Sequence, residues 1–186
     1  EKIIKYNFKK ITFLEKALTH KSFNNIDNNE KLEFLGDRVL GLVISEKLLD
    51  KYPLEKEGII DKKFANLVTK KTCSRVAKKI NLKKYIILGL SHQKPTRSAD
   101  KISSDCLEAI VGAIYLDGGL KSAEKFIFMF WEEYLLKSTI TLIDSKTKLQ
   151  EFSLKQFKEL PKYVFFKKTG PQHRPLFKTE VQIPNS

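Results

Sequence analysis

Two groups of carboxylates, each spaced to share one face of a helix inside an otherwise apolar segment, constrain this chain more than any other feature. Glu30, Glu33 and Asp37 follow one another at i, i+3 and i+7. Far downstream, Asp105 and Glu108 are three residues apart among Leu, Ile, Ala, Val and Gly. Residues at these spacings lie on the same side of an α-helix. Burying an acid in apolar surroundings costs free energy unless the acid is paired or bound to a metal ion. We therefore expect these acids to belong to a functional site.

The net charge of the chain limits the kinds of partner that it is expected to bind. The 186 residues contain 35 Lys and Arg against 22 Asp and Glu, a formal net charge of +13. Such a field favours polyanions, either nucleic acid or an anionic membrane surface, although a lysine-rich composition can also simply keep a protein soluble. No apolar run approaches the roughly 20 residues needed to span a bilayer, so no membrane partner is expected. Cys73 and Cys106 lack metal-type spacing, and we expect small core residues in a reducing, cytoplasmic setting.

Residues 1–140 are predicted to be mainly helical. Helical periodicity favours helices over residues 13–19, 30–52, 59–79, 102–115 and 122–136. Either Asn28 or Asn29 can cap the second of these helices, and Pro53 ends it. The glycine pair at 118–119 is expected to end the second acid-bearing helix.

From residue 145 onward the pattern changes to α+β. The predicted order is a helix, a strand, a turn and a second strand, over residues 146–157, 162–168, 170–171 and 176–183. We therefore expect two domains: an all-helical one over residues 1–140 and a smaller α+β one over residues 145–186.

The acids suggest a chemistry. Four or five carboxylates that converge from two helices can hold Mg²⁺ or Mn²⁺, which take oxygen ligands and keep several waters. Beside a phosphodiester, such an ion can lower the pKa of bound water and stabilise charge on the phosphoryl and leaving oxygens. A basic protein with an acidic metal site is therefore a coherent nuclease design. His20, His92 and His173 are too scattered for a zinc site. From spacing alone, a solvated helix face explains the acids almost as well.

Four blocks of sequence resemble the ribonuclease III family in order and spacing. Residues 30–40 (E-K-L-E-F-L-G-D-R-V-L) are similar to the family signature E-R-L-E-F-L-G-D-A-V-L, and residues 17–22 (A-L-T-H-K-S) to A-L-T-H-x-S. Glu57 and Gly58 stand where the family has E-G after a proline. Residues 105–119 (D-C-L-E-A-I-V-G-A-I-Y-L-D-G-G) resemble D-x-x-E-A-L-I-G-A-I-Y-L-D-x-G. The resemblance covers essentially the whole predicted helical domain.

This resemblance implies an all-helical nuclease domain with Mg²⁺-dependent endoribonuclease activity on double-stranded RNA, in which Mn²⁺ can substitute. The catalytic, metal-binding residues would be Glu33, Asp37, Asp105 and Glu108. Glu30 and Glu57 would be accessory acids, Phe34 would pack into the partner subunit of a homodimer, and His20 would stabilise helix packing. Each subunit would cut one strand by hydrolysis and leave 5′-phosphate and 3′-hydroxyl ends with a short 3′ overhang. Structured precursors such as ribosomal and messenger RNA are the expected substrates.

The second domain resembles the first half of a double-stranded-RNA-binding domain. Residues 146–152 (K-T-K-L-Q-E-F) are similar to K-T-x-L-Q-E-x, and residues 170–173 (G-P-Q-H) to a G-P-x-H loop. By this likeness, 2′-hydroxyls in the RNA minor groove would be contacted by Thr147, Gln150, Glu151 and His173. A third strand and a second helix should follow Ser186, so we expect an incomplete domain that buries its sheet face poorly.

Two departures from the family pattern are visible. Arg38 stands where the family usually has a small residue, beside the predicted cleft. The loop before Ile102 lacks the usual Gly-Gly run, although it keeps Lys94, Arg97 and Lys101 for contact with substrate.

Two rival functions remain open. One is a degenerate family member that binds RNA or serves as a ribosomal structural protein without cutting, and the four filled acid positions argue against it. The other is a helical enzyme of a different class, in which Mg²⁺ grips a small diphosphate substrate. The basic excess and the RNA-binding-like second domain argue against that rival.

Overall fold

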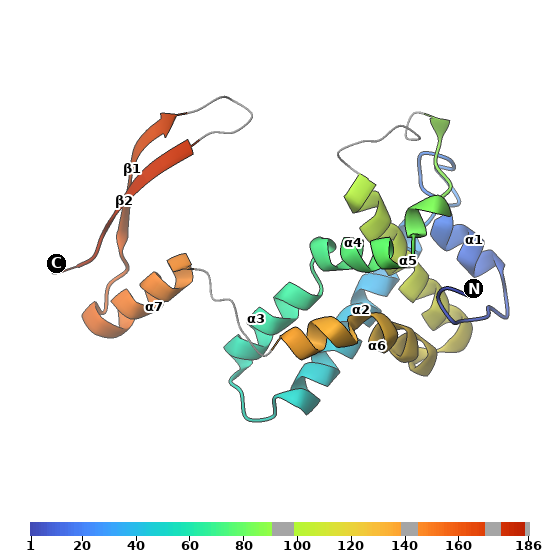
Figure 1. The fold of residues 1–186 in the computed structure, drawn as a ribbon, viewed down its shortest axis with the longest axis horizontal. Helices are drawn as coiled ribbons and strands as arrows, with labels where there is room; N and C mark the ends of the chain where they lie inside the picture. The colour runs from blue at the N-terminus through green and yellow to red at the C-terminus, as the bar shows by residue number, and fades with distance from the viewer. Residues whose placement is uncertain (91–98, 139–144, 170–175, 185–186) are drawn as a thin grey trace. The chain divides into compact units, whose positions relative to one another are not determined.

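The computed structural model describes residues 1–90, 99–138, 145–169 and 176–184. The chain divides into two compact units, Glu1–Thr141 and Leu142–Ser186, and each is described by itself. The first unit is helical and the second combines a helix with a two-stranded sheet (Figure 1). The predicted fold class, mainly α with a small α+β part, is confirmed.

The first unit is built around one buried helix. In chain order its elements are α1 (Thr12–Leu18), α2 (Glu30–Lys51), α3 (Glu57–Leu67), α4 (Lys70–Lys79), the short 3₁₀ turn η1 (Leu82–Lys84), α5 (Ala99–Gly118) and α6 (Leu120–Lys137). Helix α5 packs against α1, α2, α4 and α6, and its residues from Ile102 to Ile114 are almost all buried. Trp131 of α6 is fully buried in the same core. No helix of the described residues combines the length and apolar character needed to cross a membrane.

Helices α2 and α5 cross at two glycines. A Cβ atom on Gly36 would lie 1.7 Å from the carbonyl oxygen of Glu108, and one on Gly112 would lie 2.3 Å from the carbonyl oxygen of Leu32. The two backbones therefore touch, which only glycine permits. This close crossing brings the acid-bearing stretches of both helices together.

The predicted single helix over residues 59–79 is wrong. The chain leaves helical geometry at Thr69, whose backbone is extended (φ −65°, ψ 149°). The Thr69 hydroxyl accepts a hydrogen bond from the backbone N–H of Thr72 at 3.1 Å and so caps the start of α4. The indole N–H of Trp131 donates to the carbonyl oxygen of Leu67 at 3.0 Å, at the end of α3. The Thr69 cap and the hydrogen bond from the buried Trp131 thus split a continuous pattern of apolar residues into two helices.

The other helix ends agree with the sequence more closely. Asn29 occupies the N-cap position of α2, but its side chain makes no cap bond. The side chain of the preceding Asn28 instead accepts from the backbone N–H of Glu30 at 3.0 Å. Gly119, with φ of 76°, separates α5 from α6 as expected. Helix α5 begins at Ala99, three residues before the predicted start.

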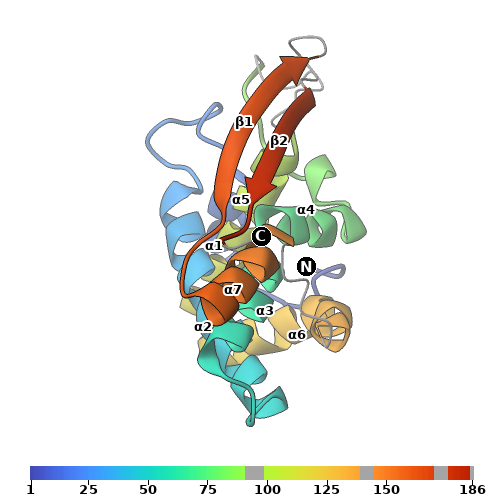
Figure 2. The ribbon, with the colours of Figure 1, turned by 90° about the vertical axis from the view of Figure 1, so that its left-hand side faces the viewer.

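The second unit contains α7 (Ser145–Phe157), β1 (Lys162–Thr169) and β2 (Leu176–Gln182). The strands are antiparallel, with Lys162 opposite Gln182 and Thr169 opposite Leu176, and they run side by side in Figure 2. The register is irregular between Phe165 and Lys167. The predicted helix and strands are therefore confirmed, and the predicted turn at residues 170–171 lies outside the described residues.

Candidate metal centre

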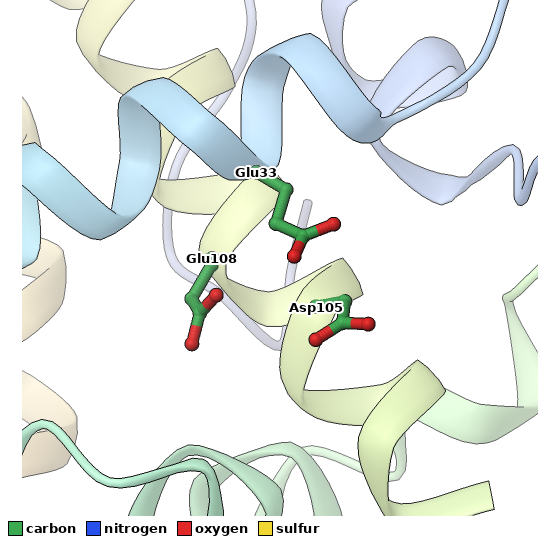
Figure 3. A group of neighbouring side chains, drawn as sticks. All are labelled: Glu33, Asp105 and Glu108. Atoms are coloured by element: carbon green, nitrogen blue, oxygen red, sulfur yellow. The ribbon is translucent and has the colours of Figure 1, made fainter. Parts of the chain in front are cut away.

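Three carboxylates converge where α2 crosses α5. Each of Glu33, Asp105 and Glu108 offers one oxygen, and these oxygens lie within 4.8 Å of one another. Asp105 and Glu108 are one turn apart on α5, and Glu33 faces them from α2, so that all three point into the same space (Figure 3). The helical spacing puts the two α5 acids on one face, and the glycine crossing brings the third within reach.

Burial makes this carboxylate cluster unfavourable as a set of bare anions. Glu108 is only 5% exposed, and burial, together with the charges of Asp37 and Asp105, raises the pKa of its carboxyl to about 7. The pKa of Glu33 is also raised, first by burial and then by Asp105. The Ser104 hydroxyl donates to Glu108 Oε1 at a long 3.4 Å. Three oxygen donors that repel one another in this way fit a hard divalent cation, which would offset their charge.

Asp37, the fourth predicted acid, does not belong to this group of three, although its charge acts on Glu108. It pairs with the neighbouring Arg38. It nevertheless lines the same cleft of about 420 Å³ as Glu33 and Glu108, with Arg38 and Lys70 on the walls. The structure thus brings three of the four acids into one group and leaves the fourth on the wall of the cleft. Their assignment as metal ligands stays a prediction.

The two accessory acids differ in position. Glu30 accepts a hydrogen bond from Lys21 Nζ at 2.7 Å and lines both the cleft and a second hollow of about 240 Å³, next to Glu33. Glu57 is an exposed residue in the first turn of α3 and lines neither of these spaces. Glu30 is therefore a neighbour of the carboxylate cluster, and Glu57 is not.

Phe34 is a large apolar residue left exposed beside the acids. It is 65% exposed, and the guanidinium of Arg38 lies 4.9 Å from the centre of its ring. His20 makes local bonds: its Nδ1 lies 2.8 Å from the Ser22 hydroxyl and accepts from the Ser22 backbone N–H at 3.1 Å. His20 also lines the hollow next to Glu33, and its expected role in helix packing stays a prediction.

The predicted RNA-binding residues fall on the second unit. Thr147, Gln150 and Glu151 belong to α7, where their spacing puts them on one helix face. Gln150 is half-buried and Glu151 is exposed. His173 lies outside the described residues.

Sequence reasoning missed Lys70, the first residue of α4. Its Nζ donates to Asp105 Oδ1 at 2.8 Å, so a cation from a third helix contacts the carboxylate cluster. Because the helix break at Thr69 was not predicted, the start of α4 at Lys70 was not predicted either.

Cys73 and Cys106 are free thiols and fully buried, as predicted. Burial raises the pKa of the Cys73 thiol, and the nearby Glu108 raises it further.

The fold and the site define a class: a helical, strongly basic protein with an acidic site suited to a divalent cation. Comparison with known proteins identifies the family within this class. A family model described as ribonuclease-III-like matches residues 10–135. The chain belongs to the ribonuclease III family and is an endoribonuclease.

Relatives and solved structures agree with this family. The chain is 56% identical over its full length to ribonuclease 3 of Pelagibacter ubique (strain HTCC1062), of which it spans 84%. It is 43% identical to ribonuclease 3 of Ehrlichia ruminantium (strain Welgevonden), with 98% of this chain and 82% of the relative covered. Among solved structures, the nuclease domain of ribonuclease III from Campylobacter jejuni matches with a TM-score of 0.69 and 39% identity, over 72% of this chain and 94% of that one.

Proposed function

We propose that this protein is a Mg²⁺-dependent endoribonuclease that cleaves double-stranded RNA in the cytoplasm. The observation that carries the proposal is the carboxylate cluster of Glu33, Asp105 and Glu108, within 4.8 Å of one another in a strongly basic protein. Acidic side chains oppose a phosphodiester unless a cation lies between them, whereas surface lysines attract the backbone. The two free, buried thiols support a reducing compartment.

The carboxylate cluster supplies the ligands in this proposal. Glu33, Asp105 and Glu108 would hold the ion, and Asp37 would join them from the wall of the cleft by giving up Arg38. Mn²⁺ would substitute, because it takes the same oxygen ligands. Bound there, the ion would supply a hydroxide from its water and stabilise charge on the phosphate. The protein orients the ligands through the glycine crossing of α2 and α5.

Two copies of this site would act together in a homodimer. Each would hydrolyse one strand and leave 5′-phosphate and 3′-hydroxyl ends with a short 3′ overhang. The exposed ring of Phe34 supports a contact with the partner subunit beside the cleft, because a large apolar side chain at the surface gains from burial. The Campylobacter jejuni nuclease domain is described as having a flexible region involved in dimer formation.

The unit from residue 145 to 186 would act as the first half of a double-stranded-RNA-binding domain, joined to a nuclease domain over residues 1–140. Its face of Thr147, Gln150 and Glu151 on α7, with His173, would contact 2′-hydroxyls of the RNA minor groove. Such a domain reads A-form shape rather than sequence, so structured precursors of ribosomal and messenger RNA are suitable substrates.

A duplex-cleavage assay tests the proposal. The protein is incubated with a long RNA duplex and Mg²⁺, with and without EDTA, and short products are expected only without the chelator. Glu108→Gln should bind the duplex in a gel-shift assay without cutting it, and Glu132→Gln, an exposed acid on α6, should cut as the parent does. Cleavage by Glu108→Gln at the parent rate would contradict the role of Glu108. Binding without cleavage by the parent would favour the degenerate, RNA-binding member of the family.

A further inference from the structure

We propose that Lys70 is an exchangeable counter-cation of the carboxylate cluster, which holds Asp105 in the metal-free protein and moves to a phosphate oxygen of the RNA when a divalent ion binds. The inference rests on the proposed function and adds a residue that the acid motifs do not contain. Lys70 Nζ is 2.8 Å from Asp105 Oδ1. Lys70 also lines the cleft that holds Glu33 and Glu108.

A lysine at position 70 does not stabilise α4 itself. Lys70 and Lys71 are the first two residues of α4, and its first turn contains no acid. Positive charge at a helix N-terminus opposes the helix dipole. The charge of Lys70 is instead compensated across space, by Asp105 of α5. The pKa of the Lys70 ammonium is raised, first by its hydrogen bond to Asp105 and also by the charges of Glu108 and Glu33.

The side chains of Lys70 and Asp105 differ in their exposure to solvent. The side chain of Asp105 is 14% exposed, whereas that of Lys70 is 58% exposed. A lysine head is a compact charge on a flexible four-carbon stem, so it can leave while the buried carboxylate stays. A divalent ion on Asp105 would repel the ammonium at its present distance, and the adjoining cleft offers it room. A phosphodiester in that cleft is the anion that both cations attract.

Two consequences distinguish this exchange from a purely structural ion pair. Removing the charge of Lys70 should strengthen binding of a divalent ion, because the competitor for Asp105 is lost. The same change should weaken cleavage of RNA at saturating metal, because a phosphate contact is lost. A lysine that only supports the fold would not strengthen metal binding when removed.

The test compares the parent with Lys70→Gln, Lys70→Arg and Lys71→Gln. Lys71 lies in the same helical turn and makes no hydrogen bond or ion pair with any described residue, so it is the matched control for loss of charge. Mn²⁺ alone is titrated into each metal-free protein by calorimetry, and folding is checked by thermal melting. We expect Lys70→Gln to bind Mn²⁺ about 2- to 5-fold more tightly, and Lys70→Arg and Lys71→Gln to bind it as the parent does.

Cleavage is then measured at saturating Mn²⁺. Lys70→Gln should raise KM for the duplex or lower kcat by about 10-fold, with recovery in Lys70→Arg. Unchanged or weaker Mn²⁺ binding by a folded Lys70→Gln would overturn the competition, and unchanged KM and kcat would overturn the contact with phosphate. A parent that binds Mn²⁺ but never cuts RNA would instead contradict the proposed function, and the calorimetry would still decide whether Lys70 competes with the ion.

Discussion

Gly36 and Gly112 face each other where α2 crosses α5, and they set the separation between the acids that the two helices carry. A Cβ atom on Gly36 would lie 2.8 Å from the backbone nitrogen of Gly112, in addition to its clash with the Glu108 carbonyl oxygen. Glu33 precedes Gly36 by one helical turn, and Glu108 precedes Gly112 by about one turn on α5. The geometry of the carboxylate cluster therefore depends on the absence of two side chains.

We predict that Gly36→Ala pushes α2 and α5 apart, because the added methyl group meets backbone atoms that cannot rotate away. The free energy of unfolding should fall by about 1–3 kcal/mol, and Mn²⁺ binding should weaken because Glu33 is withdrawn from the α5 acids. Gly41→Ala on the same helix is the control. Its Cβ would lie 3.5 Å from the ring of Phe64, an ordinary contact, so it should be neutral or stabilising. Equal stabilities of the two variants in urea unfolding would contradict the prediction.

The spacing of the acids predicts which of them share a face of one helix. Their convergence from two helices could be expected only from the resemblance to the family, because the glycine crossing that produces it is a tertiary contact. The orientation of each side chain could not be predicted. Asp37 has the spacing of a fourth member of the carboxylate cluster, yet it pairs with Arg38, which follows it directly. A helical pattern places a Cα atom on a face, but the rotamer depends on which cation is near.

The contact between Lys70 and Asp105 could not be predicted from the sequence for a different reason. Phe64, Leu67, Val68 and Val76 keep a continuous helical period across the break between α3 and α4, and neither Pro nor Gly marks it. The break is made by the Thr69 cap and by the tryptophan that binds the end of α3, and the second of these is a tertiary contact. Only the folded chain could reveal that a helix begins next to Asp105.

A second prediction concerns pH. Burial raises the pKa of Glu108 to about 7 in the folded, metal-free protein, from an ordinary value of 4.5. Between these pH values the folded state holds a proton that the unfolded chain has released, so the contribution of Glu108 to stability is fully present below pH 4.5 and is lost by about pH 7. The loss should amount to at most about 3 kcal/mol.

Urea unfolding in EDTA across this range measures the effect. Glu108→Gln cannot titrate, so its free energy of unfolding should fall less than that of the parent as pH rises. Addition of Mn²⁺ should reverse the trend for the parent, because the ion competes with protons for the carboxylates and binds more tightly at higher pH. A parallel pH dependence for parent and variant in EDTA would show that Glu108 does not carry the effect.

Assembly gives a third prediction. Phe34→Ala should shift the monomer–dimer equilibrium towards monomer, by about 1–2 kcal/mol or more in the free energy of association, because a fully buried Phe contributes about that much. Leu54, which is 97% exposed, is the control for loss of a surface apolar side chain. Sedimentation equilibrium at several protein concentrations makes the measurement. The same dimer constant for Phe34→Ala and Leu54→Ala would remove Phe34 from the interface.

The last prediction concerns Lys63, a lysine on α3 whose side chain is 1% exposed. Its Nζ donates to the carbonyl oxygen of Ser138 at 2.7 Å, at the end of α6. It also lies 3.5 Å from Glu55 Oε1 and 4.3 Å from the centre of the Tyr52 ring. A buried charge is tolerated only when such partners replace water, and its removal leaves them without that charge. This lysine therefore joins the end of α6 to α3 and to the segment that precedes it.

Lys63→Met keeps most of the apolar stem and removes the ammonium, so it separates the effect of charge from that of volume. We expect a loss of about 2–4 kcal/mol in the free energy of unfolding, because the Ser138 carbonyl and the Glu55 carboxylate both lose a buried partner. Lys125→Met, at an exposed position of α6, should change it by less than about 0.5 kcal/mol. Because Lys63 is outside the carboxylate cluster, Mn²⁺ affinity of the folded variant should equal that of the parent. Parent-like stability for Lys63→Met would mean that water or rearranged neighbours satisfy both groups equally well.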